Sequence, residues 1–131
     1  MRLDHLLVLT DDIDATASFW RDAFALAVGD RPDLPFPGHW LYGSAGPCVH
    51  VAGRAAYAAH AATMGLSVPG GAGGPIDHVA FTASDYEACV ARLDALGASY
   101  APNFIPGPDI RQLFVSDPNG VRVEINVLPG A

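Results

Sequence analysis

The sequence predicts an α+β fold in which one chain of 131 residues forms two βαβββ modules. The first observation is a repeated phrase, Leu3-Asp4-His5 and Ile76-Asp77-His78, in which each histidine accompanies a short apolar strand. The second is that each copy precedes apolar residues at helical spacing and then several strand-like segments. We expect a single domain, with modules at 1–52 and 76–131 and a linker at 53–75.

An acidic start and a glycine stop mark the expected helix of each module. Residues 11–14 contain a weaker analogue of a capping box, and Gly29 ends the helix that follows. In the second module Ser84 and Glu87 form a capping box, and Gly97 provides the stop. The shared pattern predicts one strand and one helix at the start of each module.

Strand-like segments follow each expected helix. In the first module they lie near 40–44 and 47–52. In the second they lie near 99–104, 110–116 and 121–128. The last two are joined by Asp-Pro-Asn-Gly, which places proline and glycine where a tight turn needs them and predicts a β-hairpin.

Three further segments connect these elements. The Pro-rich stretch 31–38 is typical of a loop. An Ala-rich piece, 54–64, is compatible with a short helix, and the Gly-rich run 69–74 is typical of a flexible connector. Because each half is too small to hide its sheet alone, the halves must pack on each other or on those of a second chain.

The composition excludes several classes of partner. The formal net charge is −7, with seven Arg and no Lys, so the chain lacks the concentrated basic face that nucleic acid or an acidic membrane requires. No apolar run approaches the roughly 18 residues that span a bilayer. Arg2 and Asp4 argue against a secretory signal, so we expect a cytoplasmic protein. Cys48 and Cys89 are expected to be small buried residues rather than a disulfide.

The repeat also selects candidate metal ligands. His5 and His78 occupy the same place in the two copies. In 121–127 the odd positions are aliphatic and the even ones polar, so Glu124 lies on a polar face of its strand. Shifting His50 by the repeat interval lands next to Glu124. Three imidazoles and one carboxylate suit a divalent metal ion such as Zn, Fe, Ni, Mn or Co.

Some of these assignments leave alternatives open. His50 is either a fourth ligand or a nearby proton-transfer group, and Glu124 is both a ligand and a candidate base. His39 and His60 lie in connecting segments and are expected not to be ligands, although His39 is a candidate pocket residue. The aspartates that precede the paired histidines point to the opposite strand face, where capping or backbone bonding is the expected role.

These motifs resemble the vicinal oxygen chelate superfamily, which includes glyoxalase I, type I extradiol dioxygenases, methylmalonyl-CoA epimerase, and fosfomycin- and bleomycin-resistance proteins. The resemblance rests on 3–5 with the following helix, 76–81, and 114–125, where strand, Asp-Pro-Asn-Gly turn, strand and Glu124 follow each other. It implies paired βαβββ modules with mixed, curved sheets and a metal-holding cup. It also implies that His5, His78 and Glu124 are metal ligands.

The resemblance leaves three functions open. Glyoxalase I has a carboxylate where this chain has His50, and no clear glutathione-binding pattern is present, so a true lactoylglutathione lyase is not expected. If His50 binds the metal, about two positions remain for a bidentate substrate, which favours a glyoxalase-like lyase or isomerase. If His50 does not bind, about three positions remain, which favours an Fe(II) extradiol dioxygenase. The third alternative is a non-catalytic protein that binds a drug or metabolite.

The expected substrate is a small molecule with adjacent oxygens, and the expected assembly is a homodimer. Sequence alone leaves open whether the site forms within one chain or across two. Aromatic and basic side chains near the metal would select the substrate. The candidates are Phe36, Trp40, Tyr42, Phe104, Arg111, Gln112 and Arg122.

Overall fold

A computed structural model of the protein describes residues 3–68 and 76–130. The chain divides into two compact units, one before and one after residue 70, and each is described by itself. The Gly-rich run 69–74 of the expected linker lies outside the described residues. Within the described ranges, no helix is both long and apolar enough to cross a membrane.

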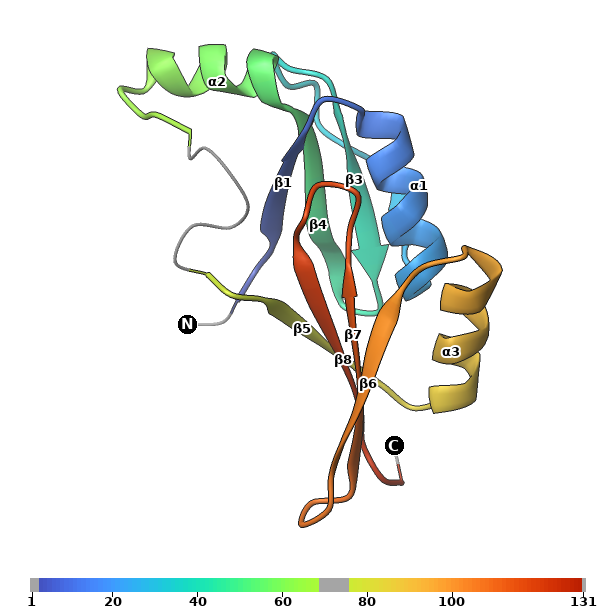
Figure 1. Ribbon diagram of the computed structural model, residues 1–131. Coiled ribbons are helices and arrows are strands. Elements are labelled where there is room, and N and C mark those ends of the chain that lie inside the picture. Colours follow the sequence, from blue (N-terminus) through green and yellow to red (C-terminus); the bar gives the residue numbers. More distant parts are fainter. Residues whose placement is uncertain (1–2, 69–75, 131) are drawn as a thin grey trace. The chain divides into compact units, whose positions relative to one another are not determined.

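The first unit is a four-stranded mixed sheet with two helices (Figure 1). Its elements are β1 (Leu6–Thr10), α1 (Ile13–Phe24), β2 (Ala27–Gly29), β3 (Gly38–Gly43), β4 (Gly46–Gly53) and α2 (Arg54–Thr63). The strand order is β1-β4-β3-β2. The β1 and β4 strands run parallel, whereas the other neighbours are antiparallel.

The second unit repeats this topology. Its elements are β5 (Val79–Ala83), α3 (Tyr86–Ala95), β6 (Tyr100–Ile105), β7 (Ile110–Ser116) and β8 (Arg122–Val127). The strand order is β5-β8-β7-β6, and the first and last strands of the unit again run parallel. The predicted α+β fold with two βαβββ modules is confirmed.

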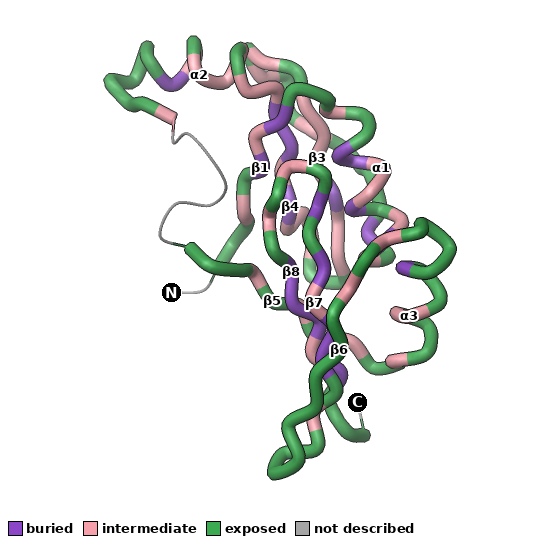
Figure 2. The backbone as a smooth tube through the Cα atoms, in the orientation of Figure 1, coloured by how far each residue is buried: buried purple, intermediate pink, exposed green. Residues whose placement is uncertain are grey.

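Residues of helices and strands together form the apolar core of each unit. Trp20 of α1 is fully buried, and α1 packs on β3 and β4, where Leu41 and Val49 are also fully buried. In the second unit, Leu93 of α3 and Leu113 of β7 have no exposed surface. Figure 2 shows buried segments along the strands and in α1 and α3.

The helices α1 and α3 are each capped by an aspartate, Asp12 and Asp85, which lies one residue after the start of the expected capping box. Asp12 accepts a hydrogen bond from the Ala15 amide, and Asp85 accepts one from the Ala88 amide, each at 3.0 Å. The expected capping box of Ser84 and Glu87 is therefore wrong. Asp85 is the residue that caps the helix, and it accepts from the Ala88 amide, whereas a cap at Ser84 would have bound the Glu87 amide.

The helix ends differ between the units. Gly97 has a φ of 64° just after α3, which confirms the predicted stop. In contrast, α1 ends at Phe24, and Ala25 adopts the left-handed conformation with a φ of 54°. Gly29 therefore does not end the helix but lies in β2, a short strand that the sequence did not predict.

The remaining predicted elements are confirmed. The Ala-rich piece forms α2, which contacts β1 and β4 and so belongs to the fold of the first unit rather than to a free linker. The Asp-Pro-Asn-Gly turn joins β7 to β8. Its Asp117 carboxylate accepts hydrogen bonds from the Asn119 and Val121 amides at 2.8 Å, and Gly120 has a φ of 86°.

Close approach of two backbone segments explains why Gly38 stands at the start of β3. A Cβ atom at Gly38 would lie 2.1 Å from the carbonyl oxygen of Val51. The adjacent Gly53 amide donates to the Pro37 carbonyl at 3.1 Å. The end of the Pro-rich loop is therefore fixed against β4 by contacts that leave no room for a side chain.

Replacing Gly38 by alanine is expected to lower the free energy of unfolding by about 1–3 kcal/mol, because the strands must separate to admit the methyl group. Urea unfolding followed by circular dichroism measures the change. Gly107→Ala is the matched control, since a Cβ atom there meets nothing within 4 Å. Equal stability of Gly38→Ala and the unaltered protein would contradict the close approach.

Candidate functional site

In the first unit, two predicted ligands and one predicted substrate residue form a stack of rings. The His5 and His50 imidazoles lie face to face, with centroids 3.8 Å apart and planes 15° apart. Trp40 covers the other face of His50 at 4.0 Å and 6°. The His50 ring is therefore held between an imidazole and an indole.

Strand pairing explains the stack. Within the sheet, His50 of β4 lies opposite Leu7 of β1 on one side and Trp40 of β3 on the other. Opposite residues of paired strands project from the same face of a sheet. His5 precedes Leu7 by two residues, so alternation along an extended chain returns it to that face.

The second unit places a histidine beside a carboxylate in the same way. The Nε2 atom of His78 lies 2.9 Å from Oε2 of Glu124. Phe114 of β7 stands edge-on to the His78 ring, with centroids 6.4 Å apart. We call His5 with His50 the first half-site, and His78 with Glu124 the second half-site.

The two half-sites occupy the same register in their sheets. Leu7 pairs with His50, and Ala80 pairs with Glu124. Leu7 and Ala80 each lie two residues after the histidine of their unit's first strand segment. The inference from the repeat interval, that His50 is the counterpart of Glu124, agrees with this strand pairing.

Each paired histidine is held by the aspartate that precedes it. Nδ1 of His5 lies 2.6 Å from Asp4, and Nδ1 of His78 lies 2.8 Å from Asp77. Each aspartate thus contacts the imidazole beside it, a role that the expected capping or bonding to nearby backbone did not include. Arg122 contacts both Asp77 oxygens at 3.1 Å. The hydrogen bond with His78 and the charge of Arg122 lower the pKa of Asp77.

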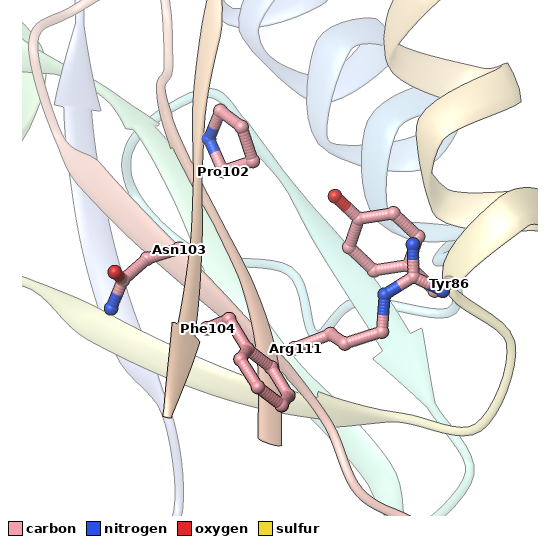
Figure 3. A pocket seen from close by; sticks show the side chains of 5 residues that line it. All are labelled: Tyr86, Pro102, Asn103, Phe104 and Arg111. Carbon is pink, nitrogen blue, oxygen red and sulfur yellow. The ribbon is translucent and has the colours of Figure 1, made fainter. Parts of the chain in front are cut away.

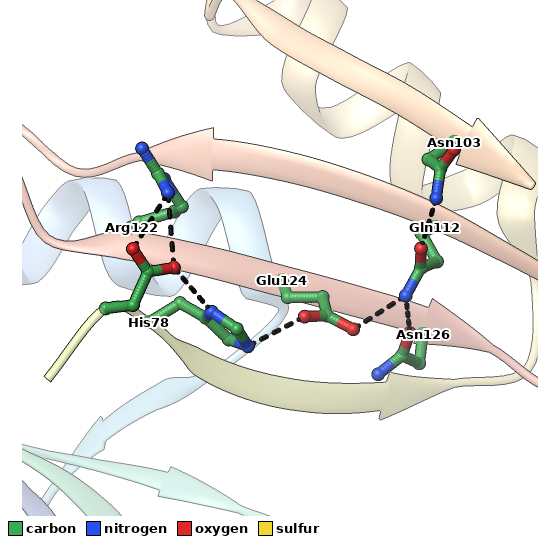
Figure 4. Close-up of polar contacts among 7 residues, drawn as sticks. His78, Asn103, Gln112, Arg122, Glu124 and Asn126 are labelled. Carbon is green, nitrogen blue, oxygen red and sulfur yellow. Dashed lines mark hydrogen bonds and ion pairs between the residues drawn. The ribbon is translucent and has the colours of Figure 1, made fainter.

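A chain of amides orients Glu124 from the other side (Figure 4). Gln112 Nε2 donates to Glu124 Oε1 at 2.8 Å and to Asn126 Oδ1 at 2.9 Å. Asn103 Nδ2 donates to Gln112 Oε1 at 2.7 Å, which fixes the orientation of the Gln112 amide. Glu124 and Gln112 are both buried, so this network holds the carboxylate in one position.

The two contacts of His78 require a proton or a metal ion beside its Nε2 atom. Its two ring nitrogens each face a carboxylate oxygen, one of Asp77 and one of Glu124. A neutral imidazole carries a single N–H and cannot donate to both. Either a second proton or a metal ion must therefore satisfy the Nε2 side. A metal-binding histidine usually coordinates the ion through one ring nitrogen and donates a hydrogen bond to a carboxylate from the other.

Tyr42, Phe104 and Arg111, which are also predicted substrate residues, face groups outside the half-sites. The Tyr42 hydroxyl donates to the Asp30 carbonyl at 2.6 Å. Phe104 and Arg111 lie on the opposite face of their sheet from Gln112, because side chains alternate along β6 and β7. They line an open hollow with Tyr86, over whose ring the Arg111 guanidinium lies at 3.3 Å (Figure 3). Arg122 is engaged by Asp77.

The remaining candidate side chains have structural partners. His39 contacts Asp14 at 2.8 Å. Cys48 and Cys89 are free thiols, and burial raises the pKa of Cys89.

Sequence reasoning missed Phe114, although its position ten residues before Glu124 across a tight turn was a usable signal. Across residues 3–68 and 76–130, no group of three or more His, Cys, Asp or Glu side chains gathers around a common point.

Comparison with known families identifies the class of protein. Residues 2–125 match the Glyoxalase/Bleomycin resistance protein/Dioxygenase superfamily. The chain belongs to this superfamily, as the resemblance of its motifs had predicted. Comparison with curated protein sequences finds no significant match.

Solved structures share the fold at low sequence identity. A lactoylglutathione lyase from Agrobacterium tumefaciens is 21% identical with a TM-score of 0.71, covering 96% of this chain and 92% of that one. A glyoxalase/bleomycin resistance protein/dioxygenase family enzyme from Burkholderia phytofirmans is 20% identical with a TM-score of 0.71, covering 98% and 99%. A mutant fosfomycin resistance protein from Listeria monocytogenes, complexed with Mn(II) and 1S,2S-dihydroxypropylphosphonic acid, is 14% identical with a TM-score of 0.70, covering 98% and 93%.

The ring stack makes a prediction about protonation. Burial, followed by the positive charge of a protonated His5 and then of Arg31, lowers the pKa of His50, whereas Asp4 raises it. An NMR titration of the metal-free protein should therefore give His50 a midpoint below the ordinary histidine value of about 6.5. With this lowered pKa, the unfolded chain binds a proton at His50 at a higher pH than the folded protein does. The free energy of unfolding should therefore decrease as the pH falls from the ordinary histidine value through the lowered pKa of His50. His50→Phe should remove this pH dependence, and a midpoint at or above the ordinary value would contradict the burial effect.

Proposed function

We propose that this protein is a divalent-metal-dependent enzyme of the glyoxalase-like lyase or isomerase class, acting on a small substrate with two neighbouring oxygens. The observation that carries the proposal is the common register of His50 and Glu124, each paired with a carboxylate-held histidine in its own unit. The proposed metal ligands are His5, His50, His78 and Glu124.

The donor set fits such an ion. Three imidazoles and one carboxylate suit Zn, Fe, Ni, Mn or Co, and the Asp4 and Asp77 contacts leave Nε2 of each paired histidine as the coordinating atom. A bound ion would act as a Lewis acid toward the two substrate oxygens. A set of four ligands favours this class over ring cleavage, which needs room for both a catechol and dioxygen.

The protein's own side chains would then manage the proton. Glu124 is the proposed base that takes a proton from the carbon beside the substrate oxygens, because its carboxylate is buried and oriented. Gln112 donates to Oε1, so Oε2, the atom nearest His78, is the oxygen that would hold a bound ion and, once released from it, accept the proton. The rings of Trp40 and Phe114 would exclude water from the two half-sites.

Metal affinity tests the ligand set directly. The metal-free protein should bind about one Zn²⁺, Mn²⁺, Ni²⁺ or Co²⁺ per chain, as measured by calorimetry and by elemental analysis. His5→Ala, His78→Ala and Glu124→Gln should each weaken binding by more than the roughly 10–100-fold loss typical of removing an outer partner. His39→Ala is the control, because this half-buried histidine pairs with Asp14 outside the half-sites. Failure of the unaltered protein to bind any of these ions would overturn the proposal and favour a binding protein without turnover.

Proton exchange tests the reaction class. In D₂O, the metal-loaded protein should introduce deuterium at the carbon beside the carbonyl of a small 2-hydroxy carbonyl compound, as followed by NMR. Glu124→Gln, loaded with metal at saturating concentration, should slow this exchange by about 10²–10⁴-fold, the usual contribution of a general base. Exchange at the rate of free metal would contradict the lyase or isomerase assignment.

One observation favours an extradiol dioxygenase as the second candidate. His50 is sandwiched between Trp40 and His5, a position that also suits an acid or base that does not bind the metal. In that case His50→Ala would leave metal affinity unchanged. The protein loaded anaerobically with Fe(II) would then convert a catechol to a yellow ring-cleavage product after air is admitted.

A further inference from the structure

A cavity of about 250 Å³ opens beside the first half-site and lies wholly within the first unit. Its walls come from β1, β3, β4, the Pro-rich loop and α2. Most of its large side chains carry aromatic rings or a positive charge. They are Arg31, Phe36, Trp40, His50, Tyr57 and His60.

The Pro-rich loop and α2 form an aromatic wall. Phe36 meets Tyr57 edge to face, with centroids 5.1 Å apart and planes 88° apart. His60, three residues along α2 and so on the same helix face, lies 5.2 Å from the Phe36 ring. The indole of Trp40, stacked on His50, lines the same cavity. A flat ring entering the cavity would therefore meet aromatic faces and edges from several elements.

Arg31 supplies a cationic group to this wall. One of its terminal nitrogens donates to the Phe36 carbonyl at 2.6 Å, and its guanidinium lies over the Phe36 ring at 5.2 Å. Among the residues that the structure describes, no carboxylate forms an ion pair with Arg31. A guanidinium has five N–H donors, so several remain for an anionic oxygen in the cavity.

We propose that this cavity binds a small aromatic anion, with its ring against Phe36, Trp40 and Tyr57 and its anionic group at Arg31. The cavity lies just below the roughly 300–1,000 Å³ that suits drug-sized ligands, which limits the occupant to about one substituted ring. The assignment of this cavity as the substrate pocket of the metal centre rests on the proposed function. Binding of the aromatic anion to the cavity requires no metal.

Binding of three related probes to the metal-free, full-length protein tests the proposal by calorimetry. Benzoate has the ring and the charge, benzamide lacks the charge, and cyclohexanecarboxylate lacks the flat ring. Benzoate should bind about tenfold or more tightly than either of the others, as expected for one additional charge-assisted contact or one aromatic contact. Equal affinity for benzoate and benzamide, or for benzoate and cyclohexanecarboxylate, would overturn the assignment.

Variants locate the binding site. Arg31→Gln should remove the preference for benzoate over benzamide, and Arg31→Lys should restore part of it. Arg21→Gln is the matched control, because Arg21 is exposed on α1 and paired with Asp22. Thermal unfolding of each variant checks that the loop remains folded. Unchanged benzoate affinity in Arg31→Gln would overturn the proposal even if the protein binds aromatic acids elsewhere.

Metal binding, measured separately, distinguishes this inference from the proposed function. Benzoate binding by a protein that takes up no divalent ion would support the pocket and overturn the metal-dependent enzyme. Metal binding with no affinity for any of the three probes would overturn the pocket and leave the enzyme assignment in place.

Discussion

The parallel pairing of the first and last strands in each unit is the constraint on which both half-sites depend. It sets His50 opposite Leu7 and Glu124 opposite Ala80, and it brings each of these side chains to the same sheet face as the histidine two residues earlier. A shift of one residue in either pairing would turn the side chain to the other face. Apolar neighbours on the last strand of each unit, such as Val49, Val51, Val123 and Ile125, are buried, so core packing and site geometry depend on the same register.

The sequence contained enough information for the architecture and for the pairing of half-site residues, because a repeat preserves topology and register together. It was less informative wherever two residues could play one role. Asp12 and Asp85 cap helices beside equally suitable neighbours, and Ala25 takes a left-handed conformation usually adopted by glycine. Alternation along β7 was a usable signal that Arg111 faces away from Gln112. The sequence contained no such signal for the stacking of rings across strands, because stacking depends on side-chain rotamers.

The two units have diverged around a shared frame. In the second unit, amides from three neighbouring strands orient the carboxylate, and the site is a polar network. In the first unit, α2 and the Pro-rich loop bring aromatic side chains to the equivalent place, and no such amide chain is present among its described residues. One βαβββ plan thus supports a carboxylate held by amides in one copy and a ring-lined cavity in the other.

The exchange of a carboxylate for an imidazole at one register position changes the local electrostatic potential. The chain as a whole carries a formal charge of −7, which repels small anions at long range in dilute salt. At this register position the first unit has the His50 imidazole where the second has the Glu124 carboxylate, and Arg31 lines the same cavity. The first unit therefore offers a locally cationic pocket on an acidic protein. Long-range repulsion would slow the approach of anions while the pocket retains those that enter, so ionic strength should affect association more than dissociation.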